Sequence, residues 1–460
     1  MNLSKYFGSK TFYQRLIAVA GPILIQNVIT NFVSLLDNIM VGQVGTEPMS
    51  GVAIVNQLIF VFNLCIFGAL SGPGIFSAQF FGKGDLEGVR NSMRTKIYLS
   101  FGISAVFAAA FLAAGDPLIS LFLHEGSDNL DLNATLLYGR DYLRIMLLQV
   151  LPFAITQAYS STLRETGETV LPMKAGFVAV FVNLGLNYIL IFGKLGAPVL
   201  GVAGAAIATV TARFAECGIV VIWTHTHRQR CPYIVGFYRT LRVPLKLLKQ
   251  ITVTGLPMLG NELLWSLGIA ALNQCYSMRG LEVVSATNIA STISDLFICV
   301  SLATGTAISI IIGQLLGAGE TVRAVEEDRK LVVFTVLLNI AVGLIMAAVS
   351  PLIPRIYNTT ETAKHIAVQM LLLSAAVLPF NAYTSSVYFT LRSGGKTLIT
   401  FLFDAGYNCG ITVPLAMLLS RCTSMAIIPM YACVQGMYLF KCILGVFLLR
   451  SKKWVNNLVE

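Results

Sequence analysis

The sequence predicts an all-α polytopic membrane protein, with twelve transmembrane helices forming two six-helix lobes related by an axis along the membrane normal. Three observations predict this fold: the composition, the hydropathy profile and an internal repeat. Of the 460 residues, 56% are hydrophobic and only 12% are charged, whereas about 25% are charged in soluble domains. A soluble enzyme of this length would need far more polar surface, so the composition excludes that class.

Hydropathy breaks divide the chain into twelve candidate spans, each close to the roughly 20 apolar residues that a membrane helix needs. The spans lie near residues 16–40, 52–80, 97–123, 140–163, 174–193, 201–223, 250–277, 285–315, 331–353, 366–391, 397–419 and 425–449. The first apolar stretch is too long for the core of a signal peptide, so we interpret it as a transmembrane helix.

The basic residues are distributed unequally between the two sides of the predicted spans. The side that holds the N-terminus carries 23 of the 32 Lys and Arg residues, the other side carries seven, and Arg213 and Lys441 fall within spans. Cytoplasmic loops are enriched in Lys and Arg, so this asymmetry places both termini in the cytoplasm. An even number of crossings is therefore required, and twelve fits.

The longest polar interruption runs from Thr224 to Lys249 and carries six basic residues but no acidic ones. We interpret residues 224–249 as a basic cytoplasmic linker between an N-lobe at 1–223 (transmembrane helices 1–6) and a C-lobe at 250–460 (transmembrane helices 7–12). Contact with anionic lipid headgroups or nucleic acid is the alternative for such a segment. The enrichment of Lys and Arg in cytoplasmic loops already accounts for the positive charge of this segment. We therefore expect no nucleic-acid partner.

The two halves of the chain repeat each other in sequence. A shift of 235 residues places Gln79 on Gln314 and Gly82 on Gly317 without a gap, and a shift near 228 pairs Leu-Arg-x-x-Gly-x-Thr at 163–169 with its copy at 391–397. Six spans separate equivalent positions, so both halves have the same orientation in the membrane. Two such bundles around a shared cleft are a usual architecture for alternating access, and the repeat therefore favours a transporter.

Several short motifs occur in a specific order along nearly the whole chain. They are Gly21-Pro22, Asp37-Asn38-x-Met40-Val41-Gly42, Gln79-Phe80-x-Gly82, the two Leu-Arg-x-x-Gly-x-Thr copies, Gly201 to Thr209, and Lys453-Trp454-x-x-Asn457-Leu458. Together they resemble the prokaryotic multidrug and toxic compound extrusion (MATE) transporters.

The resemblance implies two six-helix lobes forming a V, with a central cavity that exports organic cations or amphiphiles against an inward H⁺ or Na⁺ gradient. It also implies a multi-pass protein of the plasma (inner) membrane. We expect small-molecule organic cations or amphiphiles and the lipid bilayer as partners, and a monomeric chain. No cofactor is expected besides the coupling ion, H⁺ or Na⁺.

Asp37 is the strongest candidate for cation binding, because it lies in an otherwise neutral stretch of the first span. An ionisable side chain in an apolar span is costly and therefore indicates function. A carboxylate there can take up a proton, or bind Na⁺ and an organic cation in exchange. A hydrogen-bonded structural Asp is the alternative. In the family that the chain resembles, an Asp at this motif position is the cation-binding carboxylate.

Asn183 and Asn187 lie one helical turn apart in the fifth span and share a face. With Asp37 and the Thr209 hydroxyl they can form an oxygen-only cluster suited to a hard cation. An Asn pair can also simply join two membrane helices. Many relatives in the resembled family carry Asp where this chain has Asn187, so the site has one carboxylate fewer and Na⁺ coupling stays open.

The second lobe offers Glu262 and Asp404 as further candidates for cation or substrate binding. Some members of the resembled family use a Glu in span seven with an Asp in span ten, but Asn381 stands near the latter position here. Two basic side chains, Lys441 and Arg213, also lie within spans, and we expect both to have structural roles. Lys441 can snorkel or pair with Asp404, and Arg213 lies three residues before Glu216, with which it can pair.

The sequence indicates neither an enzyme nor a metal site, and we name no catalytic or metal-binding residue. The chain contains no H-E-x-x-H, G-x-S-x-G or G-x-x-x-x-G-K motif, and its nine cysteines form no C-x-x-C pair. We therefore expect a secondary active antiporter that works by alternating access. The alternative is a flippase of the same superfamily, for lipid-linked oligosaccharide or another amphiphile.

Overall fold

The computed structural model describes residues 5–120, 132–357 and 359–460. These residues form long α-helices and contain no β-strand. The helices of the first half are α1 (Lys10–Gly42), α2 (Thr46–Lys83), α3 (Leu86–Ser120), α4 (Leu132–Glu165), α5 (Val170–Phe192) and α6 (Gly201–Thr226). Those of the second half are α7 (Leu245–Ser277), α8 (Leu281–Gly317), α9 (Thr321–Val349), α10 (Glu361–Ser393), α11 (Thr397–Phe401), α12 (Val413–Cys422) and α13 (Ile427–Arg450).

The all-α polytopic class with twelve long helical segments is confirmed for the described residues. Helix α11 continues through two π-helical stretches, Leu402–Gly406 and Asn408–Thr412, into α12, so residues 397–422 form one continuous segment. Ten of the helical segments are long and apolar enough to cross a membrane. The other two, α4 and α7, carry more polar residues, including Asn261 and Glu262 on α7.

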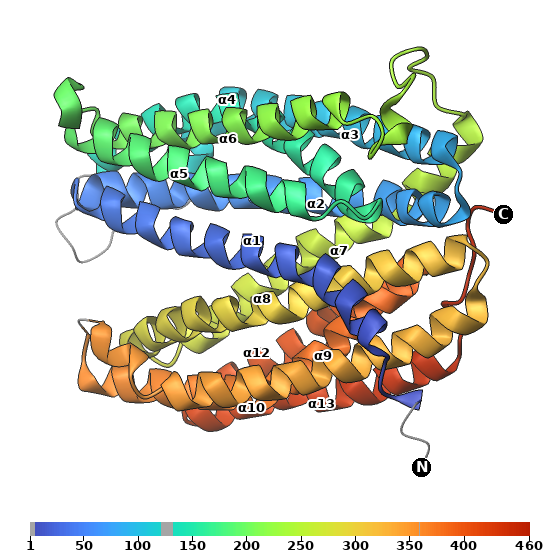
Figure 1. The fold of residues 1–460 in the computed structure, drawn as a ribbon. Coiled ribbons are helices and arrows are strands. Elements are labelled where there is room, and N and C mark those ends of the chain that lie inside the picture. The colour runs from blue at the N-terminus through green and yellow to red at the C-terminus, as the bar shows by residue number, and fades with distance from the viewer. Residues whose placement is uncertain (1–4, 121–131, 358) are drawn as a thin grey trace. The chain divides into compact units, whose positions relative to one another are not determined.

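One compact unit comprises residues 25–77 and 86–251. Within it, α4 packs against α3 and α6, and α5 packs against α6 (Figure 1). Its core is apolar and includes the fully buried Val55 and Ile66 of α2 and the buried Met146 of α4. The unit contains the predicted site residues of α1, α5 and α6.

The other compact unit comprises residues 1–24, 78–85 and 252–460. Helix α10 is central to this unit and packs against α8, α9 and α13. The chain's last residues are tied to the same unit, because Gln79 donates to the Ser393 carbonyl at 2.9 Å and accepts from the Leu458 amide at 2.8 Å. Trp454 is buried beside them.

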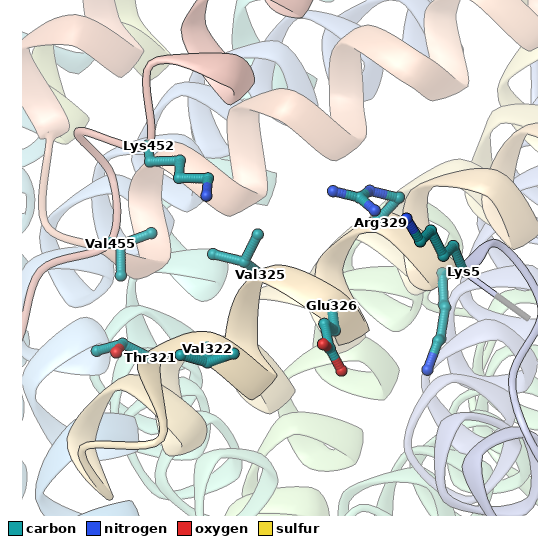
Figure 2. A pocket seen from close by; sticks show the side chains of 9 residues that line it. Lys5, Thr321, Val322, Val325, Glu326, Arg329, Lys452 and Val455 are labelled. Carbon is teal, nitrogen blue, oxygen red and sulfur yellow. The ribbon is translucent and has the colours of Figure 1, made fainter.

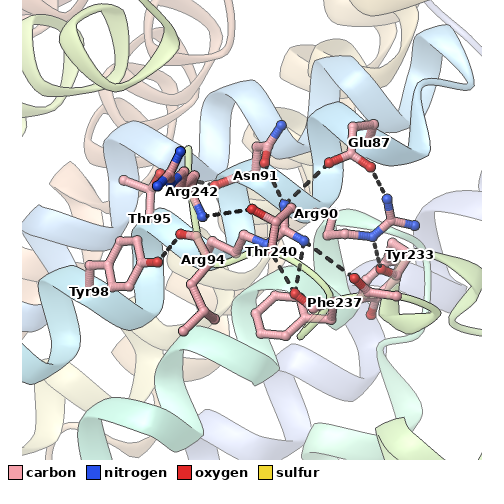
Figure 3. A network of polar contacts seen from close by, with 12 residues as sticks. Glu87, Arg90, Asn91, Arg94, Thr95, Tyr98, Tyr233, Phe237, Thr240 and Arg242 are labelled. Atoms are coloured by element: carbon pink, nitrogen blue, oxygen red, sulfur yellow. Dashed lines mark hydrogen bonds and ion pairs between the residues drawn. The ribbon is translucent and has the colours of Figure 1, made fainter. Parts of the chain in front are cut away.

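Part of the basic stretch at 224–249 is folded onto α3 (Figure 3). Arg94 is buried and donates to the Phe237 carbonyl from Nε at 3.1 Å and from Nη2 at 2.8 Å. Arg90 donates to the Tyr233 carbonyl at 3.0 Å. Charged hydrogen bonds to main-chain carbonyls hold a segment by its backbone, so this stretch belongs to the unit that contains α3.

Candidate cation-binding sites

Asp37, Asn183, Asn187 and Thr209 come together within one compact unit, although they belong to α1, α5 and α6. Asn187 Nδ2 donates to Asp37 Oδ1 at 2.7 Å. Asn183 and Asn187 are both buried and face the same way from α5, as their one-turn spacing predicted. The structure thus brings all four predicted residues of this group into one cluster.

The Asn183 amide can serve the cluster in two orientations. With its nitrogen toward the carboxylate, it donates to Asp37 Oδ1 at 2.8 Å and accepts from the Thr209 hydroxyl at 3.2 Å. In the opposite orientation it donates to Thr209 and accepts from Asn187 Nδ2 at 3.1 Å. An ionised carboxylate needs donors and a protonated one needs an acceptor, and the Asn183 amide carries both a donor and an acceptor.

Asn187 Oδ1 is buried and accepts no hydrogen bond from the described residues. An unsatisfied buried carbonyl oxygen is costly, unless a proton donor, a water or a cation meets it. With the Asp37 carboxylate and the Thr209 hydroxyl, it gives a set of oxygen donors of the kind that hard cations prefer. The cluster therefore has the chemistry to bind a small cation or a proton.

Arg213 lies near this cluster and is paired within its own helix. Its Nη1 donates to Glu216 at 2.9 Å, and its guanidinium lies over the Phe153 ring at 5.4 Å. The predicted pairing of Arg213 with Glu216 is thus confirmed. Arg213 is also close enough to Asp37 for its charge to act on the carboxylate.

The predicted residues of the second half, Glu262 and Asp404, both lie in the other compact unit. Asp404 Oδ1 accepts from Lys441 Nζ at 2.7 Å, which confirms the pairing of these two side chains. Asp404 Oδ2 accepts from Asn261 Nδ2 at 3.1 Å. Glu262 accepts from the Tyr388 hydroxyl at 3.2 Å and is close enough to Asp404 for the two charges to interact.

Sequence reasoning missed Asn261 and Tyr388 as partners of these carboxylates. Asn261 is 2% exposed and links Asp404 to the backbone, because its Oδ1 accepts from the Ala405 amide at 3.2 Å. The sequence gives only weak evidence for the role of Asn261. Asn261 is a polar residue beside Glu262 in an apolar span, and nothing in the sequence places it against the π-helical stretch around Asp404.

A basic pocket lies elsewhere in the same unit, at the start of α9 and beside the two ends of the chain (Figure 2). Its volume is about 660 Å³, and its lining includes the cations Lys5, Arg329, Lys330 and Lys452 and the acid Glu326. None of the predicted site residues lines it. Its positive charge makes it unsuited to an organic cation.

Comparison with known proteins identifies the family of this chain. The MatE family model matches residues 22–189 and 257–418. The chain belongs to the MatE family. The two matched segments cover corresponding parts of the two sequence repeats, and members of the MatE family are transporters rather than enzymes.

Relatives of similar length match along nearly the whole chain. The probable multidrug resistance protein NorM of Thermotoga maritima is 25% identical over 451 residues, 97% of this chain and 94% of that protein. The probable multidrug resistance protein YoeA of Bacillus subtilis is 25% identical over 415 residues, 88% of this chain and 87% of that protein. The crystal structure of a MATE transporter in complex with MaL6 has a TM-score of 0.85 and 19% identity and covers 98% of each chain, which shows the shared fold.

Proposed function

We propose that this MatE-family chain is a secondary active antiporter that exports organic cations or amphiphilic small molecules in exchange for H⁺ or Na⁺ by alternating access. The multidrug resistance relatives support a small-molecule substrate. The repeat of two equally oriented six-span halves supports alternating access. The excess of Lys and Arg on one side supports a multi-pass orientation with both termini in the cytoplasm, and the bacterial relatives support residence in the plasma membrane.

The cluster around Asp37 is the observation that carries this proposal. Its one carboxylate lies against the neutral amides of Asn187 and Asn183, and no cation of the described residues is directly bonded to it. An organic cation can therefore bind to the Asp37 carboxylate, and a proton or Na⁺ can replace that cation. The two orientations of Asn183 allow the same shell to hold Asp37 in both charge states.

Purified protein in liposomes tests this proposal by the efflux of a fluorescent organic cation. A pH gradient and a Na⁺ gradient are applied separately to the native chain and to Asp37→Asn. We expect one gradient to drive transport by the native chain, and the variant to lose that response because it keeps the shape but not the charge.

Asp116→Asn is the matched control. Asp116 is a carboxylate of the same unit, lies near the end of α3 and pairs with Arg140 outside the cluster. Its substitution should leave transport unchanged. If neither gradient drives transport by the native chain, or if Asp37→Asn transports normally, the proposal is wrong, and the flippase alternative is tested next with a labelled lipid-linked oligosaccharide.

A further inference from the structure

Helix α13 carries a lysine far from either of its ends. Lys441 lies nine residues before Arg450, the last residue of the helix, which corresponds to about 13 Å along the helix axis. Lysines near the ends of membrane helices extend their charge to the headgroups, but Lys441 is 7% exposed and binds within the protein. A charged side chain that is buried in a membrane helix and bonded within the protein indicates a function.

The Lys441 ammonium is held by a carboxylate and an aromatic ring. Its Nζ lies 2.7 Å from Asp404 Oδ1 and 5.1 Å from the centre of the Phe403 ring. A carboxylate beside an aromatic face is the combination that proteins use to bind organic ammonium groups. Lys441 therefore occupies a place that has the chemistry of an organic-cation site.

Asp404 is positioned independently of Lys441. Asn261 donates to Asp404 Oδ2 and accepts from the Ala405 amide, which lies in the π-helical stretch Leu402–Gly406. This bridge holds the backbone and the second carboxylate oxygen through contacts that do not involve Lys441. The Asp404 side chain is 22% exposed against 9% for Lys441, so the carboxylate is less covered than the ammonium.

The two compact units differ in how their carboxylates are neutralised. Lys441 Nζ lies 2.7 Å from Asp404 Oδ1. Asp37 in the other unit accepts from the Asn187 amide, and the nearby Arg213 is paired with Glu216. Among the described residues, Asp404 thus has a directly bonded cation of the chain itself, whereas Asp37 has none.

We propose that Asp404 and Phe403 form a second organic-cation site, and that the Lys441 ammonium is a tethered competitor that keeps this site closed until it leaves Asp404. This inference rests on the proposed function, since it assumes an organic-cation substrate. It assigns Lys441 a regulatory role at the Asp404 carboxylate, beyond that of a structural ion pair.

Equilibrium binding of radiolabelled tetraphenylphosphonium to the purified full chain tests this inference. Lys441→Met keeps the length of the side chain but removes the competing charge. We expect it to add a binding site or to tighten binding by about tenfold, since the bound phosphonium gains electrostatic attraction to the Asp404 carboxylate. Lys441→Arg keeps a cation at Asp404 and should not show the gain.

The double variant Asp404→Asn/Lys441→Met should lose the gain, because it removes the carboxylate that the probe would bind. It also removes both partners of the buried ion pair, a change that folded proteins often tolerate. Lys194→Met is the matched control, because Lys194 is an exposed lysine of the other unit. If Lys441→Met does not purify as a folded protein, Lys441→Gln replaces it, since its amide can still donate to Asp404.

Asp37→Asn separates the inference from the proposed function. Combined with Lys441→Met, it should lose the binding that the native chain shows and retain the added binding. Native binding through Asp37 without any gain in folded Lys441→Met, or in the Lys441→Gln that replaces it, overturns this inference alone. A gain that survives in the double variant with Asp404→Asn also overturns it, and the absence of native binding contradicts the proposed function instead.

Discussion

Gly82 of α2 lies directly against the backbone carbonyl of Gln314 of α8, and a Cβ at Gly82 would overlap that oxygen. The relationship is reciprocal, because a Cβ at Gly317 would overlap the carbonyl oxygen of Gln79. The shift of 235 residues that relates the two halves superposes the two glutamines and the two glycines. The repeated Gln-x-x-Gly motif is thus a self-complementary helix crossing inside one compact unit.

Gly82→Ala and Gly317→Ala should each destabilise the protein, because backbone cannot move aside as a flexible side chain can. Overpacking of this kind costs about 1–3 kcal/mol. Thermal unfolding in detergent measures the change. Gly102→Ala is the control, since a Cβ at Gly102 meets nothing within 4 Å, and we expect it to be neutral or stabilising. A Gly82→Ala protein that melts with the native chain would contradict the close crossing.

Thr209→Ala should weaken coupling-ion dependence through the Asn183 amide. The Thr209 hydroxyl is the partner that fixes this amide beside Asp37. Loss of one such hydrogen bond costs about 1 kcal/mol, so we expect the half-saturating concentration of the coupling ion to rise about fivefold. The measurement is the rate of organic-cation efflux against the concentration of the driving ion.

Thr211→Ala is the matched control for this experiment. Thr211 is an exposed residue of the same helix, and its hydroxyl donates to the Ile207 carbonyl of its own helix at 2.8 Å. Its loss should not change ion dependence. Equal effects of the two substitutions would mean that Thr209 acts through helix stability and not through the cluster.

Much of the fold and of the first cluster follows from the sequence. Hydropathy gives the twelve segments, because a membrane requires long apolar helices. The one-turn spacing of Asn183 and Asn187 fixes their common face, and the intramembrane charge of Asp37 marks the cluster. Periodicity and the cost of burial are local properties, so a single sequence reveals them.

The surroundings of Asp404 could not be predicted in the same way. A π-helical stretch differs from an α-helix by a small change in hydrogen bonding, and residues 402–412 show no sequence pattern that distinguishes the two. The bridge from Asn261 to Asp404 and Ala405 depends on how α7 packs against this stretch. Contacts of this kind arise from tertiary packing, which hydropathy and residue spacing do not reveal.

Glu165→Gln should destabilise the protein strongly, because it breaks a buried ion pair. Lys96 Nζ lies 2.5 Å from Glu165 Oε2, and the Lys96 side chain is fully buried. Removal of one partner of such a pair leaves a buried charge and costs about 3–5 kcal/mol. Thermal unfolding measures the loss.

The exposed pair of Arg140 with Asp116 provides the comparison for Glu165→Gln. Solvent screens exposed charges, so Asp116→Asn should change the melting temperature little. Similar shifts for Glu165→Gln and Asp116→Asn would show that the Lys96 pair is also solvated.

Cys231 should react with N-ethylmaleimide much more slowly than Cys422 in the native chain. Cys231 is fully buried in the stretch that is folded onto α3, whereas Cys422 is exposed. Burial raises the pKa of the Cys231 thiol, so less of the reactive thiolate is present near neutral pH. Mass spectrometry of the labelled peptides gives both rates in one experiment.

Arg94→Ala should make Cys231 reactive, because Arg94 holds this stretch through the Phe237 carbonyl. Each lost charged hydrogen bond is worth about 1.5–3 kcal/mol, so local opening and labelling should increase by roughly tenfold or more. Arg239→Ala is the control, since Arg239 is an exposed arginine of the same stretch. If Arg94→Ala leaves the slow rate unchanged, the stretch is held by its buried side chains Tyr233 and Phe237 and not by the arginine.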